Sequence, residues 1–314
     1  MGLLKILLLS AECLLLLILL VSYLTFRMGF YVDRKKAASS GENLPEGAIY
    51  EIYWDAMRAW LRETRATPHE VFTIRSFDGL TLQGKYYEYA PGAPIELMFH
   101  GYRGNAERDL CGGMQRCFRL GHSALIVDQR CSGASGGNVI TFGVKEHRDC
   151  LSWVQFALER FGPEVKLILT GISMGASTVL MAGGRELPEN VVGILADCGF
   201  TSAKDIMEDV IRKMNLLPRL VYPFVKLGAR VFGRFDPEAW SAAEAMKQCK
   251  VPVLFFHGEA DDFVPSWMSR KNYEICTSRK KLVLVPGAGH GLSYPADQEA
   301  YLENVRDFFH PGSA

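Results

Sequence analysis

The chain has 314 residues, 48% of them hydrophobic, so it is long enough for one large globular domain with additional segments. Lys and Arg together number 35, as do Asp and Glu, and the formal net charge is zero. This balance argues against a nucleic acid as the main partner, because binding to phosphates requires an excess of positive charge.

An apolar segment opens the chain. Residues 6–26 contain Glu12 as their only charge and are long enough to cross a bilayer as a helix, which takes about 20 residues. A cleaved signal peptide would have a shorter apolar region followed by a small-residue cleavage site, and residues 23–27 (YLTFR) lack that pattern. We therefore predict a single-pass membrane anchor over residues 1–27, and leave open whether it is ever cleaved.

Basic residues are more numerous after this segment than before it. Arg27, Arg34, Lys35 and Lys36 follow the apolar residues, whereas Lys5 and the amino terminus precede them. The positive-inside rule then favours the cytoplasmic side for the C-terminal part. Because the N-terminal tail is very short, the side of the membrane that carries the catalytic domain stays open.

A linker and a juxtamembrane helix are predicted over residues 28–68. Residues 37–47 (AASSGENLPEG) have the composition of a linker. Residues 49–65 carry apolar side chains at helical spacing. Their apolar stripe either packs on the following domain or lies along the membrane surface, and packing is the commoner outcome.

From residue 69 to residue 311 the chain alternates between strand and helix patterns. The hairpin signal Asp78-Gly79 separates the first two strands. The predicted strands are 71–76, 80–87, 95–100, 124–128, 166–170, 191–197, 251–257 and 282–285, and the predicted helices are 106–120, 143–161, 174–187, 266–276 and 297–309. This order predicts an α/β fold with a mostly parallel, eight-stranded sheet covered by helices on both faces.

An insertion at about residues 200–248 interrupts the alternation. It has no strand pattern and consists of apolar helical pieces separated by Pro218, Pro223 and Pro237. We predict a helical cap over the C-terminal edge of the sheet, the edge at which ligands bind in such folds.

A candidate nucleophile lies between a predicted strand and a predicted helix. Residues 171–175 are Gly-Ile-Ser-Met-Gly, the G-x-S-x-G pattern that exposes a serine on a sharp strand-to-helix turn. Gly171 and Gly175 supply room for the close approach of strand and helix, so Ser173 is the predicted nucleophile. The alternative is a serine in an ordinary glycine-rich turn.

The serine needs a base and an acid that orients the base. His290, in the glycine-rich loop after the last strand, is the predicted base. Asp261, in the loop after the penultimate strand, is the predicted acid, with Asp262 and Asp197 as rivals. The histidines at 69, 122, 147 and 310 are predicted to be surface or helix residues without a role in catalysis.

An oxyanion hole needs two backbone N–H groups. The N–H of Met174 lies at the start of the helix after Ser173, and the N–H of Tyr102 follows the His100-Gly101 pair at the end of an earlier strand. We predict that these two groups bind the oxyanion and that His100 braces the loop.

These motifs together resemble the α/β-hydrolase superfamily, in particular its serine aminopeptidase/monoacylglycerol-lipase-like branch, over roughly residues 71–309. The chain departs from that pattern at Cys131, where family members usually have a glycine. The resemblance implies a hydrolase that needs no cofactor. The eight cysteines form no C-x-x-C pair, and no spacing of His, Asp and Cys indicates a metal site.

The predicted activity is hydrolysis of an ester, thioester or amide through an acyl-enzyme on Ser173. Small-molecule acyl esters or lipid-like substrates are favoured over peptides because of the apolar insertion and the membrane anchor. A peptidase acting at a free amino terminus would need carboxylates in the cleft, and Glu208, Asp209, Glu238 and Glu244 are the candidates. The alternative outside the enzymes is a non-catalytic, membrane-tethered binding module. The sequence leaves the oligomeric state open.

Overall fold

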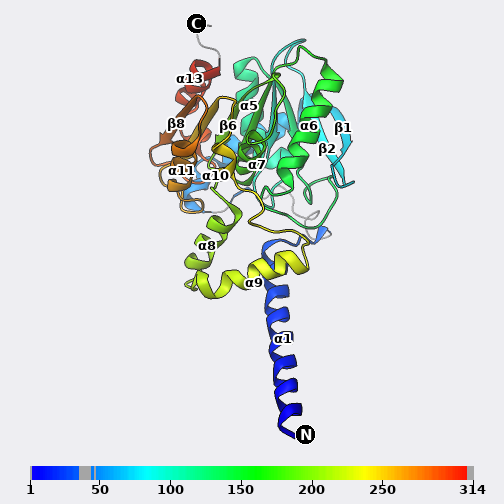
Figure 1. Ribbon diagram of the computed structural model, residues 1–314. Helices are drawn as coiled ribbons and strands as arrows, with labels where there is room; N and C mark the ends of the chain where they lie inside the picture. The colour runs from blue at the N-terminus through cyan, green and yellow to red at the C-terminus, as the bar shows by residue number, and fades with distance from the viewer. Residues whose placement is uncertain (1, 35–43, 46, 310–314) are drawn as a thin grey trace.

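An eight-stranded sheet forms the centre of the molecule. The computed structural model describes residues 2–34, 44–45 and 47–309 (Figure 1). The strands lie in the order β1-β2-β4-β3-β5-β6-β7-β8. Their bounds are β1 (Glu70–Arg75), β2 (Thr81–Tyr87), β3 (Ile95–Phe99), β4 (Ser123–Val127), β5 (Leu167–Ile172), β6 (Val191–Asp197), β7 (Val253–Gly258) and β8 (Lys280–Val285). Strands β1 and β2 are antiparallel to their neighbours and the other strands are parallel, so the predicted α/β architecture is confirmed.

The burial of the strands follows their place in the sheet. All five residues of β3 are buried, as are all six of β7, because these parallel strands are covered on both faces. Within β6, Ile194 and Ala196 join the core cluster on one face and Leu195 joins the cluster on the other, as the alternation of side chains along a strand requires.

Helices cover both faces of the sheet. Apolar side chains of α6 (Glu146–Phe161) and α7 (Met174–Gly183) belong to the core cluster on one face. Those of α5 (Ala106–Leu120) and α13 (Gln298–Phe309) belong to the clusters on the other. The structure also contains α11 (Trp267–Ile275) and the short helix α12 (Ser293–Ala296).

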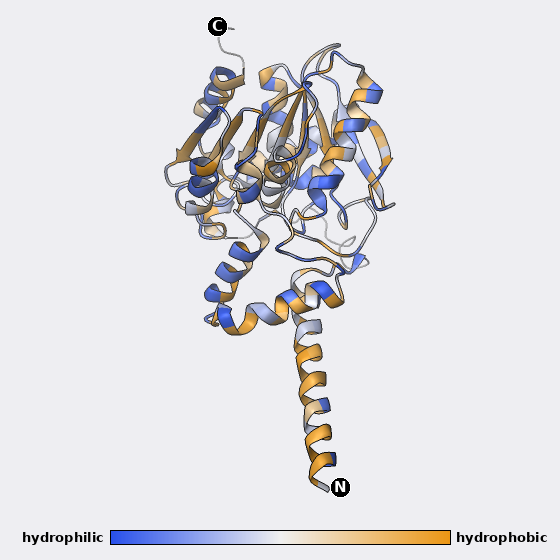
Figure 2. Cartoon of the chain, viewed as in Figure 1, coloured by the Kyte–Doolittle hydropathy of each residue, from blue (hydrophilic) through white to orange (hydrophobic). Residues whose placement is uncertain are grey.

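A long apolar helix, α1 (Gly2–Gly29), projects from the domain (Figures 1 and 2). Its most hydrophobic 18-residue window is not buried by any other part of the described chain. Its C-terminal end is different, since Phe26 and Phe30 are buried in the main core. The ring of Phe30 lies 5.7 Å from that of Phe142 and 5.2 Å from that of Phe235.

The insertion is helical, as predicted, and forms α8 (Ala203–Lys213), α9 (Pro218–Val231) and α10 (Ala242–Met246). Helix α9 crosses α1 (Figure 1). At the crossing a Cβ on Gly228 would lie 2.2 Å from the carbonyl oxygen of Ser22, so only glycine allows this approach. Thr25 donates a hydrogen bond to the carbonyl oxygen of Phe224 at 3.2 Å, which adds a polar contact between the two helices.

The predicted juxtamembrane helix is present as α3 (Ala48–Glu51) followed by α4 (Trp54–Ala66). Helix α4 packs on α5, and the ring of Trp60 lies 5.7 Å from that of Tyr294, so packing on the domain is confirmed. Most of the predicted linker, at residues 37–43 and 46, lies outside the described residues.

Candidate active site

Ser173 occupies the turn between β5 and α7. Its backbone has φ 56° and ψ −119°, a region that non-glycine residues rarely adopt. A Cβ on Gly171 would lie 2.2 Å from the carbonyl of Gly175, and a Cβ on Gly175 would lie 2.0 Å from the carbonyl oxygen of Phe99. Both positions therefore require glycine, for the reason predicted from the sequence.

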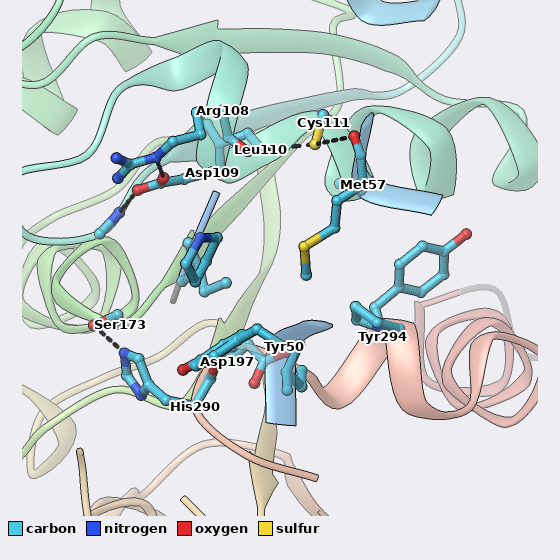
Figure 3. Close-up of a pocket in the computed structure, with 18 of the residues that line it drawn as sticks. Tyr50, Met57, Arg108, Asp109, Leu110, Cys111, Ser173, Asp197, His290 and Tyr294 are labelled. Carbon is cyan, nitrogen blue, oxygen red and sulfur yellow. Dashed lines mark hydrogen bonds and ion pairs between the residues drawn. The ribbon is translucent and has the colours of Figure 1, made fainter. Parts of the chain in front are cut away.

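His290 links Ser173 to Asp261. Nε2 of His290 lies 2.9 Å from the Ser173 hydroxyl (Figure 3), and Nδ1 lies 2.7 Å from Oδ2 of Asp261. The structure thus brings together three side chains that lie far apart in the sequence. With Nδ1 donating to the carboxylate, Nε2 is free to accept the serine proton, which is the arrangement of a serine hydrolase.

Asp261 is buried, and several donors hold its carboxylate. Its Oδ1 accepts the N–H groups of Phe263 at 2.9 Å and Val264 at 2.8 Å, and Nε2 of His257 lies 3.3 Å from its Oδ2. Burial raises the pKa of Asp261, but hydrogen bonds with His257 and His290 outweigh that effect and hold the pKa well below its usual range. Asp261 therefore keeps its negative charge beside the imidazole.

The two rival acids do not contact His290 through a hydrogen bond among the described residues. Oδ1 of Asp197 accepts the hydroxyl of Ser293 at 2.7 Å, and Oδ2 lies 3.4 Å from the hydroxyl of Tyr301. Asp262 is exposed at the edge of the cavity described below. Of the three candidates, Asp261 has the geometry of a triad acid.

The loop after β3 lies directly against the serine. A Cβ on Gly101 would be 3.5 Å from Cβ of Ser173. The N–H of Gly101 donates to Oδ2 of Asp109 at 3.2 Å, which leaves the following N–H, that of Tyr102, as the candidate oxyanion donor of this loop. Met174 is the first residue of α7, so its N–H has no partner within the helix.

His100 fixes the start of this loop. Its Nδ1 lies 2.8 Å from the carbonyl oxygen of Gly101, and its Nε2 accepts the N–H of Gln129 at 3.0 Å. The side chain is fully buried and both ring nitrogens are occupied. This is the bracing contact that the sequence predicted.

The same loop is attached to the end of α1. The hydroxyl of Tyr102 donates to the carbonyl oxygen of Gly29 at 2.8 Å, and the guanidinium of Arg103 donates to that of Met28 at 2.7 Å. Both acceptors are C-terminal carbonyls of α1, which have no partner within the helix. The candidate oxyanion loop is thereby held against the helix that carries the apolar segment.

A cavity of about 690 Å³ lies beside Ser173 and His290 (Figure 3). Its walls are mainly apolar and come from both N-terminal and C-terminal parts of the chain; six of these residues are Met57, Trp60, Met98, Leu110, Ile172 and Tyr294. None of the residues that line it belongs to the insertion at 200–248. The helical insertion therefore does not line this cavity, and its helix α9 packs on α1.

The segment before α4 forms part of the wall of the cavity. Leu44, Pro45 and residues 47–50 line it. The hydroxyl of Tyr50 donates to the carbonyl oxygen of His290 at 3.0 Å, and a Cβ on Gly289 would lie 2.6 Å from Cδ1 of Ile49. The apolar spacing of this segment predicted packing, but no signal in the sequence indicated a contact with the histidine loop.

Two of the histidines predicted to be surface or helix residues are buried. His122 lies next to Glu96, with Nδ1 3.0 Å from its carboxylate, and Arg116 forms an ion pair with the same carboxylate. His147 lies on α6, where burial lowers its pKa to about 4. His69 is exposed, and His310 lies outside the described residues.

Cys198, Asp261 and His290 present possible metal ligands within 4.8 Å of one another. Burial raises the pKa of the Cys198 thiol well above its usual range, and metals bind the thiolate. Asp261 and His290 also hydrogen-bond each other. The chemistry of these groups fits proton transfer better than metal binding.

Comparison with known proteins gives a family match and a fold match. Residues 140–311 match the prolyl oligopeptidase family. YqkD of Bacillus subtilis is 27% identical over 76% of this chain and 78% of its own length. The membrane protein YNL320W of Saccharomyces cerevisiae is 27% identical over 60% of this chain and 61% of its own length. An esterase from Pyrococcus furiosus superposes with a TM-score of 0.64 at 21% identity, covering 78% of this chain and 92% of that protein.

The superposition confirms the α/β-hydrolase fold that the sequence motifs indicated. The family match covers the nucleophile turn and the loops with Asp261 and His290, whereas α1 to β4 lie outside it. The cavity therefore combines parts inside the matched region with an N-terminal segment outside it.

The low pKa of Asp261 predicts a pH-dependent contribution to stability. A carboxyl whose pKa is lowered on folding stabilises the protein above its unfolded pKa of about 3.9, and this contribution is lost as the pH falls through the folded pKa. The free energy of unfolding of the native chain should exceed that of Asp261→Asn by a constant amount at pH 6–7. The difference should shrink below about pH 4. Denaturant titrations at each pH measure it, and a difference that grows on acidification would contradict the assignment.

Proposed function

The chain belongs to the prolyl oligopeptidase family, and we propose that it hydrolyses carboxylic esters or related acyl compounds through Ser173, His290 and Asp261. The observation that supports this most directly is the pair of contacts of His290, 2.9 Å to the serine and 2.7 Å to the carboxylate. A serine hydroxyl is a weak nucleophile, and this arrangement supplies the base that it needs.

In the proposed mechanism, the oxygen of Ser173 attacks the acyl carbonyl while its proton passes to Nε2 of His290. The imidazolium that forms is stabilised by Asp261. The N–H groups of Tyr102 and Met174 donate to the oxyanion, and the imidazolium then protonates the leaving alcohol. Water, deprotonated by His290, attacks the acyl-enzyme, and Ser173 recovers its proton as the acid product leaves.

The walls of the cavity favour an apolar acyl group. Burying each CH₂ of a chain contributes about 0.8 kcal/mol, so an apolar cavity beside the serine selects acyl chains over charged groups. Helix α1 is long and apolar enough to cross a membrane, and a yeast relative is named as a membrane protein. These features support membrane-associated, lipid-like esters as substrates.

A peptidase is the second candidate, because the matching family is named after an oligopeptidase. The acidic residues of the insertion do not favour cleavage at a free amino terminus. Each forms an ion pair within its own segment, namely Glu208 with Arg212, Asp209 with Lys213, Glu238 with Lys226 and Glu244 with Lys247. None of these four carboxylates lines the cavity.

Replacement of the serine tests whether the chain is a catalyst or a binding module. Ser173→Ala should lower the kcat of p-nitrophenyl ester hydrolysis by about 10⁴-fold or more, since triad members act as a unit. It should also abolish labelling by a fluorophosphonate probe, while circular dichroism shows an unchanged fold. Activity retained by the variant, or a folded native chain that the probe does not label, would exclude the mechanism.

A substrate panel separates the two candidate activities. We expect kcat/KM to rise with acyl length across a series of p-nitrophenyl esters, because added CH₂ groups enter the apolar cavity. Aminoacyl and prolyl arylamides should be poor substrates of the same preparation. A higher kcat/KM on the arylamides than on the esters would favour the peptidase.

The contact between Tyr102 and α1 provides a test of the oxyanion hole. Tyr102→Phe keeps the backbone N–H but removes the hydrogen bond to Gly29, so the loop loses one of its fixed points. We expect a fall in kcat of about tenfold with little change in KM, because the oxyanion forms only in the transition state. Tyr89→Phe, at an exposed tyrosine, is the matched control. If both variants lower kcat equally, the contact of Tyr102 with Gly29 has no specific role in the proposed oxyanion hole.

A further inference from the structure

Exposed apolar side chains gather on the helical insertion, mainly at the turn between α8 and α9. They lie on the turn between α8 and α9 and along α9, and all are at least 45% exposed: Met214, Leu216, Leu217, Leu220 and Val231. We call these five residues the α9 surface. Figure 2 shows the apolar residues of α9 next to the apolar length of α1.

Helix α9 carries two different faces. Tyr222, Gly228 and Ala229 are buried against the rest of the protein. Leu220 and Val231 are exposed on another side; they lie eleven residues apart, close to three full turns of a helix, and the exposed N-cap residue Leu217 lies three residues before Leu220. The exposed apolar face therefore has no partner among the described residues.

The segment around this face has a small excess of positive charge. Residues 203–240 contain seven basic and five acidic side chains. Several of the basic side chains pair with acidic ones of the same segment, among them Arg212, Lys213, Lys226 and Arg230. An amphipathic helix with an apolar face and basic flanks is the form that binds in the plane of an anionic membrane surface.

The crossing with α1 places α9 at the level of such a surface. Ser22 and Phe26 of α1 lie at the crossing, against Gly228. At 1.5 Å per residue, the part of α1 before the crossing is about 30 Å long, which matches the hydrocarbon thickness of a bilayer. If α1 spans a membrane, α9 lies across the span where the hydrocarbon ends.

The end of α8, one residue before Met214 of the α9 surface, contacts a residue that lines the cavity. Lys213, at the end of α8, donates to the carbonyl oxygen of Phe263 at 2.9 Å. Phe263 lines the cavity, is 43% exposed, and its ring centre lies 5.1 Å from that of His290. An apolar molecule that leaves the bilayer beside the α8–α9 turn would therefore meet the rim of the cavity first.

We propose that the α9 surface docks on the bilayer that α1 spans and that acyl substrates enter the cavity from this bilayer past Phe263. The occupant is a lipid surface containing anionic headgroups. The docking itself depends on α1 and α9 alone, and only the entry of substrate rests on the proposed hydrolase function.

Photocrosslinking in lipid tests the docking without any assay of activity. The full chain, with benzoylphenylalanine replacing Leu220, is reconstituted into nanodiscs of phosphatidylcholine and phosphatidylglycerol and irradiated. The control carries the same residue in place of Val71, which is 51% exposed on the edge strand β1. A lipid-mass adduct at position 220 and none at position 71 is expected. Absence of the adduct at 220, or a crosslink between two copies of the chain, would overturn the proposal.

A kinetic measurement tests the entry of substrate. Leu217→Glu/Leu220→Glu should lower kcat/KM about tenfold for an ester dissolved in the nanodisc bilayer, since two apolar side chains no longer enter the lipid. Hydrolysis of water-soluble p-nitrophenyl acetate should stay unchanged, which also shows that the variant is folded. An equal loss on both substrates, or no loss on the bilayer ester, would overturn entry from the membrane. Inactivity of the native chain on every ester would contradict the proposed function and leave the crosslinking result valid.

Discussion

A backbone contact that only glycine permits fixes the position of Ser173. Helix α7 begins so close to β3 that a Cβ on Gly175 would overlap the carbonyl oxygen of Phe99. Strand β5 must therefore turn into α7 without an intervening loop, and Ser173 takes up the strained conformation at the turn. The N–H of Ser173 donates to the carbonyl oxygen of Asp197 at the end of β6, which ties the turn to the next strand. The neighbouring parallel strands then deliver their loops to the same edge of the sheet.

The charge of Asp261 depends on a group of donors, and this group gives the site its rigidity. A buried carboxylate is costly unless it is hydrogen-bonded. Asp261 has two backbone N–H groups and two histidines around it, and His257 is itself held by Ser269, with Nδ1 2.7 Å from the hydroxyl oxygen. Nε2 of His257 also lies 2.8 Å from the carbonyl oxygen of Val264, so both ring nitrogens of His257 are held beside Asp261. The orientation of His290 then follows from a carboxylate that is already fixed.

The sequence predicted the features that local patterns determine. Eight strands were predicted because each is a short apolar run bounded by turn residues, and the triad candidates follow from residues at strand ends. The contact of Tyr50 with His290 could not be predicted, since it joins segments 240 residues apart and no periodicity encodes it. The burial of His122 depends on its partner Glu96, which comes from another strand. Cys131 has φ 72°, a backbone conformation that favours glycine. Glycine is the residue that family members usually have at this position.

The way in which α1 joins the domain constrains its orientation. The chain is hydrogen-bonded to the domain before it reaches the linker predicted at residues 37–47. The N–H of Val32 donates to the carbonyl oxygen of Asn138, and that of Ile140 donates to Phe30, so residues 30–32 are hydrogen-bonded to the loop before α6. A helix attached by a flexible linker would leave the domain free to rotate, whereas one that ends inside the core sets its direction. The axis of α1 and the carboxyl edge of the sheet are therefore fixed relative to each other. The helix that carries the apolar segment also supports the loop proposed to bind the oxyanion.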